Sequence, residues 1–264
     1  MELIKKLRSL TGAGMIDCQK ALKESENDLE KAVDILRKKG ILKAAKRTDR
    51  DTSEGVVKMA VNESGSEGYL LEVNSETDFV SRNEKFQELA EAVLKVIKDN
   101  KPANIEELNA LPLGDLSVAD TVSTLSGTIG EKMEIKRFAI LKGETVAAYS
   151  HLGGRIGVLV ALDAPGKSEL ATEIAMQVAA TNPKYLKSEE VSPEEIEREK
   201  VIYKEQLLKE GKPEAMVDKI VEGKMGKYYS EVCLLEQEFI KEDKKRIKDI
   251  LAGANILGFI RYSL

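Results

Sequence analysis

The spacing of hydrophobic residues changes along this sequence, and that change limits the possible fold more than any other feature. Over the first forty residues, apolar positions recur every three or four residues, as in amphipathic helices. From Val56 onward they form short runs typical of strands, such as "YLLEV" at residues 69–73 and "IGVLVAL" at 156–162. Thin helical stripes return over residues 193–230. The pattern predicts an α+β protein with separate helical parts.

Residues 1–42 are predicted to form a small domain of three short helices. "TGAG" at residues 11–14 separates the first two helices, and Asn27 or Asp28 can cap the third. Gly40 is expected to end the third helix. The apolar residues at helical spacing are Ile4, Leu7, Leu10, Met15, Cys18, Ala21, Leu22, Leu29, Ala32, Val33 and Leu36.

The remaining chain divides into a linker, a two-part core and an insertion. Residues 43–55 hold almost no core-forming residues, so we interpret them as a linker. One α+β subdomain of the core is expected over residues 56–141. The other is expected over residues 142–192 and 231–264. Residues 193–230 lie between the two pieces of the second subdomain and are predicted to form an inserted antiparallel helical hairpin.

Within the core, the turn signals predict two antiparallel strand hairpins. One is joined by "NESGSEG" at residues 62–68, and the other by Lys142-Gly143. The strongly apolar run over residues 155–163 predicts a central strand. For the helical insertion, a solvated structural arm and an oligomerisation or partner-binding arm both stay open.

Composition argues against several classes of protein. With 42% hydrophobic and 33% charged residues and no apolar run long enough for a bilayer, the chain is expected to be soluble and globular. The absence of a signal-peptide pattern and of a disulfide framework favours the cytoplasm. With one histidine, His151, and no metal-ligand cluster, nucleophile signature or Walker motif, we expect no enzyme, no bound metal and no cofactor.

Charge is unevenly distributed along the sequence. The whole chain carries −5, but residues 1–50 hold 13 basic and 8 acidic residues, a net +5 that leaves −10 for the remainder. The basic segment could dock on an acidic partner or on nucleic acid, or it could simply be a solvated helix surface.

The segment "NSETDFVSRNEKF" at residues 74–86 joins a predicted strand to a predicted helix. It places the large aromatic ring of Phe79 at what should be an exposed turn. From periodicity alone, Phe79 could be an ordinary core residue or a contact for a partner. Asp78 could cap the following helix.

Five segments, in this order, resemble bacterial elongation factor Ts and together span nearly the whole chain: "LRSLTGAGMIDCQKAL", "EVNSETDFVSRNEKF", "HLGGRIGVLV", "VEGKMGKYYSEVCLLEQEFI" and "GFIRYSL". The resemblance implies an N-terminal domain like a ubiquitin-associated module. It further implies a core of two α+β subdomains with antiparallel sheets and an inserted helical hairpin of coiled-coil type.

The resemblance also implies a function, namely guanine-nucleotide exchange during translation elongation. Members of this family bind the GTPase elongation factor Tu, both GDP-bound and nucleotide-free, and promote GDP release without covalent chemistry. The family motif assigns four residues to disruption of the partner's Mg²⁺ site: Thr77, Asp78, Phe79 and Val80. Whether Asp78 acts on the metal or caps a helix stays open.

Further partner contacts carry over by position: Met15, Ile16, Ile129, Gly130, His151, Phe239 and Ile240. For Met15 and Ile16, the alternative is the core of the N-terminal domain, and for His151 it is a structural role. Phe239 and Ile240 are expected to flank the N-terminal domain. We expect no direct contact with nucleic acid or membrane, and an oligomerisation arm at residues 193–230 would make the protein a homodimer. The alternative function is an adaptor that binds protein or RNA through the basic N-terminal domain.

Many members of this family continue past the last strand with a further helical module that grips the GTPase. This sequence stops at Leu264, so that contact is expected to be missing.

Overall fold

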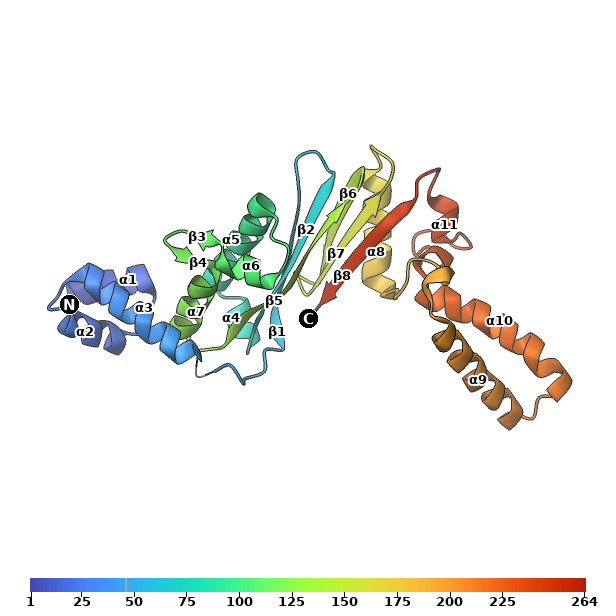
Figure 1. Ribbon diagram of the computed structural model, residues 1–264, viewed down its shortest axis with the longest axis horizontal. Coiled ribbons are helices and arrows are strands. Elements are labelled where there is room, and N and C mark those ends of the chain that lie inside the picture. Colours follow the sequence, from blue (N-terminus) through green and yellow to red (C-terminus); the bar gives the residue numbers. More distant parts are fainter. Residues whose placement is uncertain (46) are drawn as a thin grey trace.

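The computed structural model describes residues 1–45 and 47–264. The molecule is elongated, with three N-terminal helices at one end, two sheets in the middle and a helical hairpin at the other end (Figure 1). This arrangement confirms the predicted α+β class, with antiparallel sheets and an N-terminal helical part.

The N-terminal domain consists of α1 (Glu2–Thr11), α2 (Met15–Glu24) and α3 (Leu29–Ala45). Asp28 caps α3, because its Oδ1 accepts a hydrogen bond from the Lys31 N–H at 3.1 Å. The small core of this domain is formed by Leu7, Ala13, Cys18, Ala21, Leu22 and Ala32.

The expectation that Gly40 ends the third helix is wrong, because α3 runs on to Ala45. Gly40 instead lies against Gly127 in α7 (Val118–Ile129), where a Cβ added to Gly127 would overlap the backbone of Gly40. The glycine is therefore explained by close packing of two helices, which joins the N-terminal domain to the core.

Two three-stranded antiparallel sheets form the core. The first has the order β1 (Glu54–Val61), β2 (Glu67–Ser75) and β5 (Met133–Lys142). The second has the order β6 (Thr145–His151), β7 (Ile156–Leu162) and β8 (Ile256–Ser263). The first predicted hairpin and the central position of β7 are confirmed.

The second predicted hairpin, across Lys142-Gly143, is wrong. β5 pairs with β2 and β6 pairs with β7, so this short connection carries the chain from one sheet to the other. A Cβ at Gly143 would lie 2.8 Å from the carbonyl oxygen of Leu162, which explains the need for glycine at the crossing.

The two sheets pack face to face, and helices cover their outer faces. Val57, Leu70, Leu159 and Tyr262 form the apolar layer between the sheets. On the outer side of the first sheet lies α5 (Glu84–Asn100), which buries Phe86, Val93 and Ile97. On the outer side of the second lies α8 (Ser168–Thr181). Because both of its faces are covered, every residue of β2 is buried.

The smaller elements near the first sheet are α4 (Asp78–Ser81), α6 (Ile105–Ala110), β3 (Pro112–Leu113) and β4 (Leu116–Ser117). Those near the second are η1 (Ser188–Glu190), η2 (Leu234–Glu236) and α11 (Ile247–Ile250).

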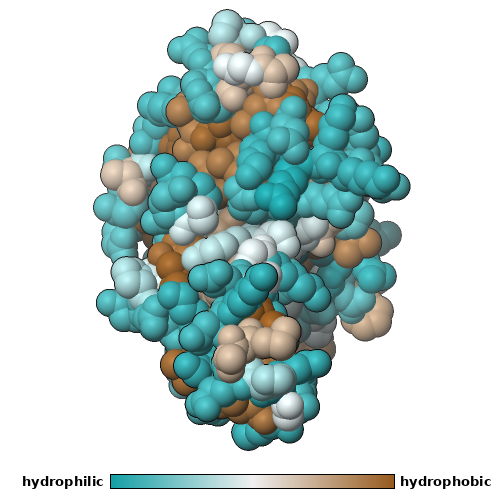
Figure 2. All heavy atoms as spheres, turned by 90° about the vertical axis from the view of Figure 1, so that its right-hand side faces the viewer, coloured by the Kyte–Doolittle hydropathy of each residue, from teal (hydrophilic) through white to brown (hydrophobic). Residues whose placement is uncertain are grey.

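The helical hairpin consists of α9 (Pro193–Lys209) and α10 (Glu214–Val232). Its own small core includes Leu207, Val217, Val221, Met225 and Tyr228. Figure 2 looks onto this end of the molecule and shows mostly hydrophilic residues, with hydrophobic ones exposed between them. The buried residues of the thin apolar stripes pack between the two helices and hold them together.

Candidate functional site

The segment between β2 and α5 forms a corner at the surface, residues 76–81, built on the single turn α4. Val80 points inward and is 6% exposed, packed against the core of the first subdomain. Phe79 is 85% exposed. Successive residues of an α-helix point about 100° apart, so burying Val80 turns the neighbouring ring outward. The corner therefore presents an aromatic side chain to the surroundings.

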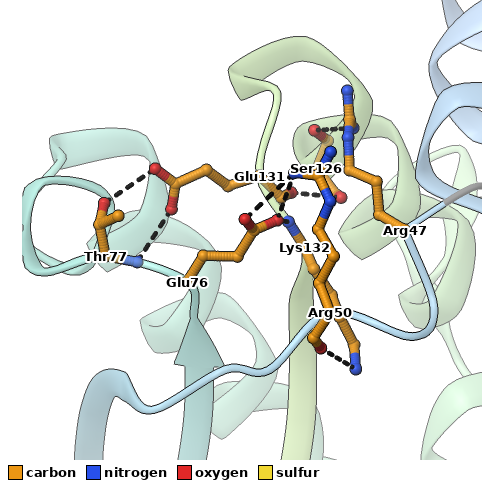
Figure 3. A network of polar contacts seen from close by, with 7 residues as sticks. All are labelled: Arg47, Arg50, Glu76, Thr77, Ser126, Glu131 and Lys132. Carbon is orange, nitrogen blue, oxygen red and sulfur yellow. Dashed lines mark hydrogen bonds and ion pairs between the residues drawn. The ribbon is translucent and has the colours of Figure 1, made fainter.

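Glu131 holds this corner from the turn after α7 (Figure 3). Its Oε2 accepts a hydrogen bond from the Thr77 N–H at 3.0 Å, and its Oε1 accepts one from the Thr77 hydroxyl at 2.8 Å. The backbone of Glu131 is itself held, because its carbonyl oxygen accepts a bond from the Ser126 hydroxyl at 2.6 Å.

Glu76 makes a second connection on the other side of the corner. Its Oε1 accepts the Lys132 N–H at 2.5 Å and forms an ion pair with Arg50 at 3.0 Å (Figure 3). Burial alone would raise the pKa of Glu76, but the Lys132 hydrogen bond and the Arg50 charge together lower it. The carboxylate form of Glu76 is thus the favoured one in the folded protein.

The predicted linker, residues 43–55, is fastened to the core at several points, although residue 46 lies outside the described part. Arg47 donates to the carbonyl oxygen of Ser126 at 3.2 Å, and Lys132 Nζ donates to the carbonyl oxygen of Arg50 at 2.9 Å. These contacts differ from the loose tether expected from composition, because the polar side chains of this segment find partners on the core.

Asp78 does not cap a helix through its side chain. Thr77 occupies the N-cap position of α4, and the side chain of Asn83 caps α5 by accepting the Lys85 N–H at 3.0 Å. The Asp78 carboxylate instead pairs with Arg82 at 3.1 Å on an exposed surface. The capping role considered for Asp78 is therefore wrong, and its partly exposed carboxylate belongs to the residue that precedes Phe79.

Met15 and Ile16 at the start of α2 are 56% and 67% exposed and do not belong to the core of the N-terminal domain. The turn before them lies beside the end of α7, because a Cβ at Gly12 would meet Thr128 and Lys85. Ile129 is half-buried against the first subdomain, and Gly130 ends α7 with φ 98°. Contacts thus run from the N-terminal domain through α7 to the corner.

His151 is exposed at the end of β6, where its Nδ1 lies 3.2 Å from the Tyr149 hydroxyl. The following turn carries Arg155, which pairs with Glu54 at 2.7 Å. The Glu54 carboxylate, and to a smaller extent that of Asp78, raises the pKa of the Arg155 guanidinium. Glu54 lies opposite Ser75 at the end of β2, so this turn lies on the same side of the molecule as the corner.

Phe239 and Ile240 lie elsewhere. Phe239 is 6% exposed within the core of the second subdomain, whereas Ile240 is exposed. The Ile240 N–H donates to Gln177 Oε1 of α8 at 2.9 Å, which places the pair beside the helix covering the far sheet. They do not flank the N-terminal domain, which packs on α7 at the other end (Figure 1).

Sequence reasoning missed Glu76, Glu131 and Arg155. Glu131 follows a glycine that ends a helix, but no local signal connects it with Thr77, 54 positions away.

Across residues 1–45 and 47–264, no three His, Cys, Asp or Glu side chains come together in a way that could hold a metal ion. No helix in the described part of the chain combines the length and apolar character needed to cross a membrane.

A protein-family model described as "Elongation factor TS" matches residues 76–264. The match covers more than two thirds of the 264 residues and begins at Glu76, so it includes the whole corner.

Proposed function

This chain belongs to the elongation factor Ts family, and we propose that it binds elongation factor Tu carrying GDP and promotes release of the nucleotide. In this role it carries out no covalent chemistry. We further propose that Asp78 and Phe79 enter the GTPase beside its Mg²⁺ site. One observation supports this mechanism above all others, namely a Phe79 ring that is 85% exposed on a turn held in place by its neighbours.

GDP binding by the partner depends on the coordination of its Mg²⁺ ion. A P-loop GTPase holds GDP through backbone amides around the phosphates and through a Mg²⁺ ion that bridges protein and phosphate. Mg²⁺ requires near-ideal octahedral geometry, so small displacements of its ligands strongly weaken the binding of the ion. The exchange factor therefore needs no contact with GDP if it stabilises a GTPase conformation in which this geometry is lost.

Phe79 supplies the differential affinity that such a mechanism needs. Burying a phenylalanine side chain stabilises a complex by about 1.5–3 kcal/mol, and that gain exists only in a GTPase conformation with a pocket for the ring. A ligand shifts a conformational equilibrium only by binding one state better than the other. By reciprocity, GDP must weaken the binding of the exchange factor by the same factor.

The remaining contacts are proposed to broaden the interface, and all but Phe239 and Ile240 lie near the corner. Met15 and Ile16 present exposed apolar side chains next to the end of α7, where Ile129 and Gly130 lie. His151 ends β6 just before the turn whose Arg155 pairs with Glu54, and Glu54 lies opposite Ser75, the last residue before the corner. Phe239 is buried, so of the last pair only Ile240 is accessible to a partner. Self-association through residues 193–230 stays a prediction.

Stopped-flow release of fluorescent GDP from elongation factor Tu tests the proposed function. The protein is expected to accelerate release in proportion to its concentration until the GTPase is saturated. Absence of acceleration at every concentration would contradict the function. RNA binding by the basic N-terminal domain would instead appear as an affinity that falls steeply with salt.

A further inference from the structure

We propose that Glu131 is a positioning residue for nucleotide exchange, because it fixes the direction in which the corner presents Phe79. The inference rests on the proposed function. It assigns a role to a side chain whose carboxylate is bonded to Thr77 and would act through that residue.

The corner needs an external support. α4 has only four residues, and a helix this short cannot maintain itself. Val80 anchors its inner side by apolar contact, which is not directional. The two hydrogen bonds from Thr77 to Glu131 are directional and involve a charged acceptor, which makes them stronger than neutral ones.

The Thr77 side chain bonds to Glu131 and does not stabilise the first turn of α4. Threonine at an N-cap normally turns its hydroxyl toward the free N–H groups of the first helical turn. Here Thr77 is the N-cap of α4, yet its side chain makes no capping bond and donates to Glu131 instead. The corner is therefore tied to another element at the expense of its own cap.

Glu131 is well placed to act as a fixed support. It follows Gly130, which ends α7, and the Ser126 hydroxyl holds its backbone. The N-terminal domain packs on the same helix through Gly40 and Gly127. Glu131 thus links the corner to α7, the helix on which the N-terminal domain with its exposed Met15 and Ile16 packs. A corner held in advance avoids the loss of conformational freedom that binding would otherwise require.

A double-mutant cycle separates positioning from plain stabilisation of the fold. Glu131→Gln keeps the size of the side chain but removes its charge and one of its two acceptors. We expect it to lower the second-order rate constant of GDP release about tenfold when Phe79 is present. In the Phe79→Ala background, the same change is expected to alter the rate constant less than twofold, because no ring is left to position.

Matched variants complete the experiment. Glu134 lies at the start of β5, three positions after Glu131, but its Oε1 accepts the Thr52 hydroxyl at 2.7 Å and not a bond from Thr77, so Glu134→Gln should stay within twofold of wild type. Thr77→Ser keeps both donors to Glu131, whereas Thr77→Val loses the hydroxyl, so Thr77→Val should slow GDP release more than Thr77→Ser does. If Glu131→Gln fails to fold, the Thr77→Ser and Thr77→Val pair is carried through the same cycle.

The outcomes distinguish this proposal from the exchange function. If the wild-type protein itself does not accelerate GDP release, the exchange function is wrong, and the positioning role with it. If wild type accelerates release but Glu131→Gln equals it, the exchange function stands and the positioning role is overturned. An equal loss with and without Phe79 also overturns it, because a role in overall folding would act in both backgrounds.

Discussion

Phe79 and Val80 are adjacent residues of the same helical turn, yet Phe79 is 85% exposed and Val80 is 6% exposed. One side chain anchors the turn in the core and the other faces outward. The exposed Phe79 ring adds little to the stability of the isolated fold, whereas a pocket in a partner would bury it and gain its apolar area.

The stabilities of two alanine variants should reflect this division. Phe79→Ala is expected to change the free energy of unfolding by less than about 0.5 kcal/mol, because the ring makes little contact. Val80→Ala should lower it by about 1–2 kcal/mol through lost burial and a small cavity. Urea denaturation followed by circular dichroism measures both. A larger loss for Phe79→Ala than for Val80→Ala would mean that the ring belongs to the protein's own core.

Asp78 should act through the partner's metal and not through helix stability. Asp78→Asn removes only an exposed ion pair with Arg82, so its effect on stability should stay below about 0.5 kcal/mol. The control Asn83→Ala removes a true cap and should cost about 1 kcal/mol. In stopped flow, Asp78→Asn should slow GDP release with Mg²⁺ present and approach wild type when EDTA removes the ion. A deficit that persists unchanged in EDTA would argue for a contact unrelated to the metal.

The contact between the N-terminal domain and the core should be weakened by an alanine at Gly127 but not by an alanine at Gly40. Gly127→Ala places a Cβ in the backbone of Gly40 and should push α3 away from α7. Gly40→Ala meets its nearest atom, the Thr124 carbonyl oxygen, at 3.5 Å, an ordinary contact. Limited proteolysis between the domains should therefore quicken for Gly127→Ala only. Equal protection of both variants would show that the joint does not depend on this close approach.

The start of β2 contains a buried acid whose charge should matter to stability. The Tyr69 hydroxyl donates to Glu67 Oε2 at 2.6 Å, while Lys101 and Lys142 form ion pairs with the same carboxylate. Burial alone would raise the pKa of Glu67, but these partners lower it to about 2 from 4.5. Its stabilising contribution is therefore complete above about pH 5 and is lost as the pH falls toward 2.

Glu67→Gln should accordingly lower the free energy of unfolding by about 2–3 kcal/mol at pH 7. The difference from wild type should shrink as the pH falls from 5 toward 2, because wild type then loses what the variant already lacks. Urea titrations across this range measure it. Glu63→Gln, at an exposed position in the preceding turn, should match wild type throughout. A difference that does not vary with pH would contradict the role of the charge.

The sequence predicted those features that depend on local pattern. The change of hydrophobic period located the helical parts at the two ends of the molecule and the sheets between them. The apolar run of β7 indicated its central position in its sheet. Asp28 was predictable as a cap because capping involves neighbours in sequence. The exposure of Phe79 could only be posed as an alternative, because periodicity does not say which side of a single turn faces the core.

Features that depend on distant partners were not predictable. β5 and β6 look like a hairpin, but each pairs with an apolar strand that needs two neighbours, and local spacing cannot reveal that. Gly40 looks like a helix end because the residue it packs against, Gly127, is far away in sequence. The bond between Thr77 and Glu131 has the same origin.

The central claim is that Phe79 works inside the partner, and GDP release at saturating exchange factor tests it most directly. Wild type and Phe79→Ala are each mixed with elongation factor Tu carrying fluorescent GDP, and the limiting release rate is read by stopped flow. Loss of about 1.5–3 kcal/mol of burial corresponds to a rate roughly ten- to a hundredfold lower for the variant. A Phe79→Ala protein that folds normally and releases GDP at the wild-type rate would contradict the account.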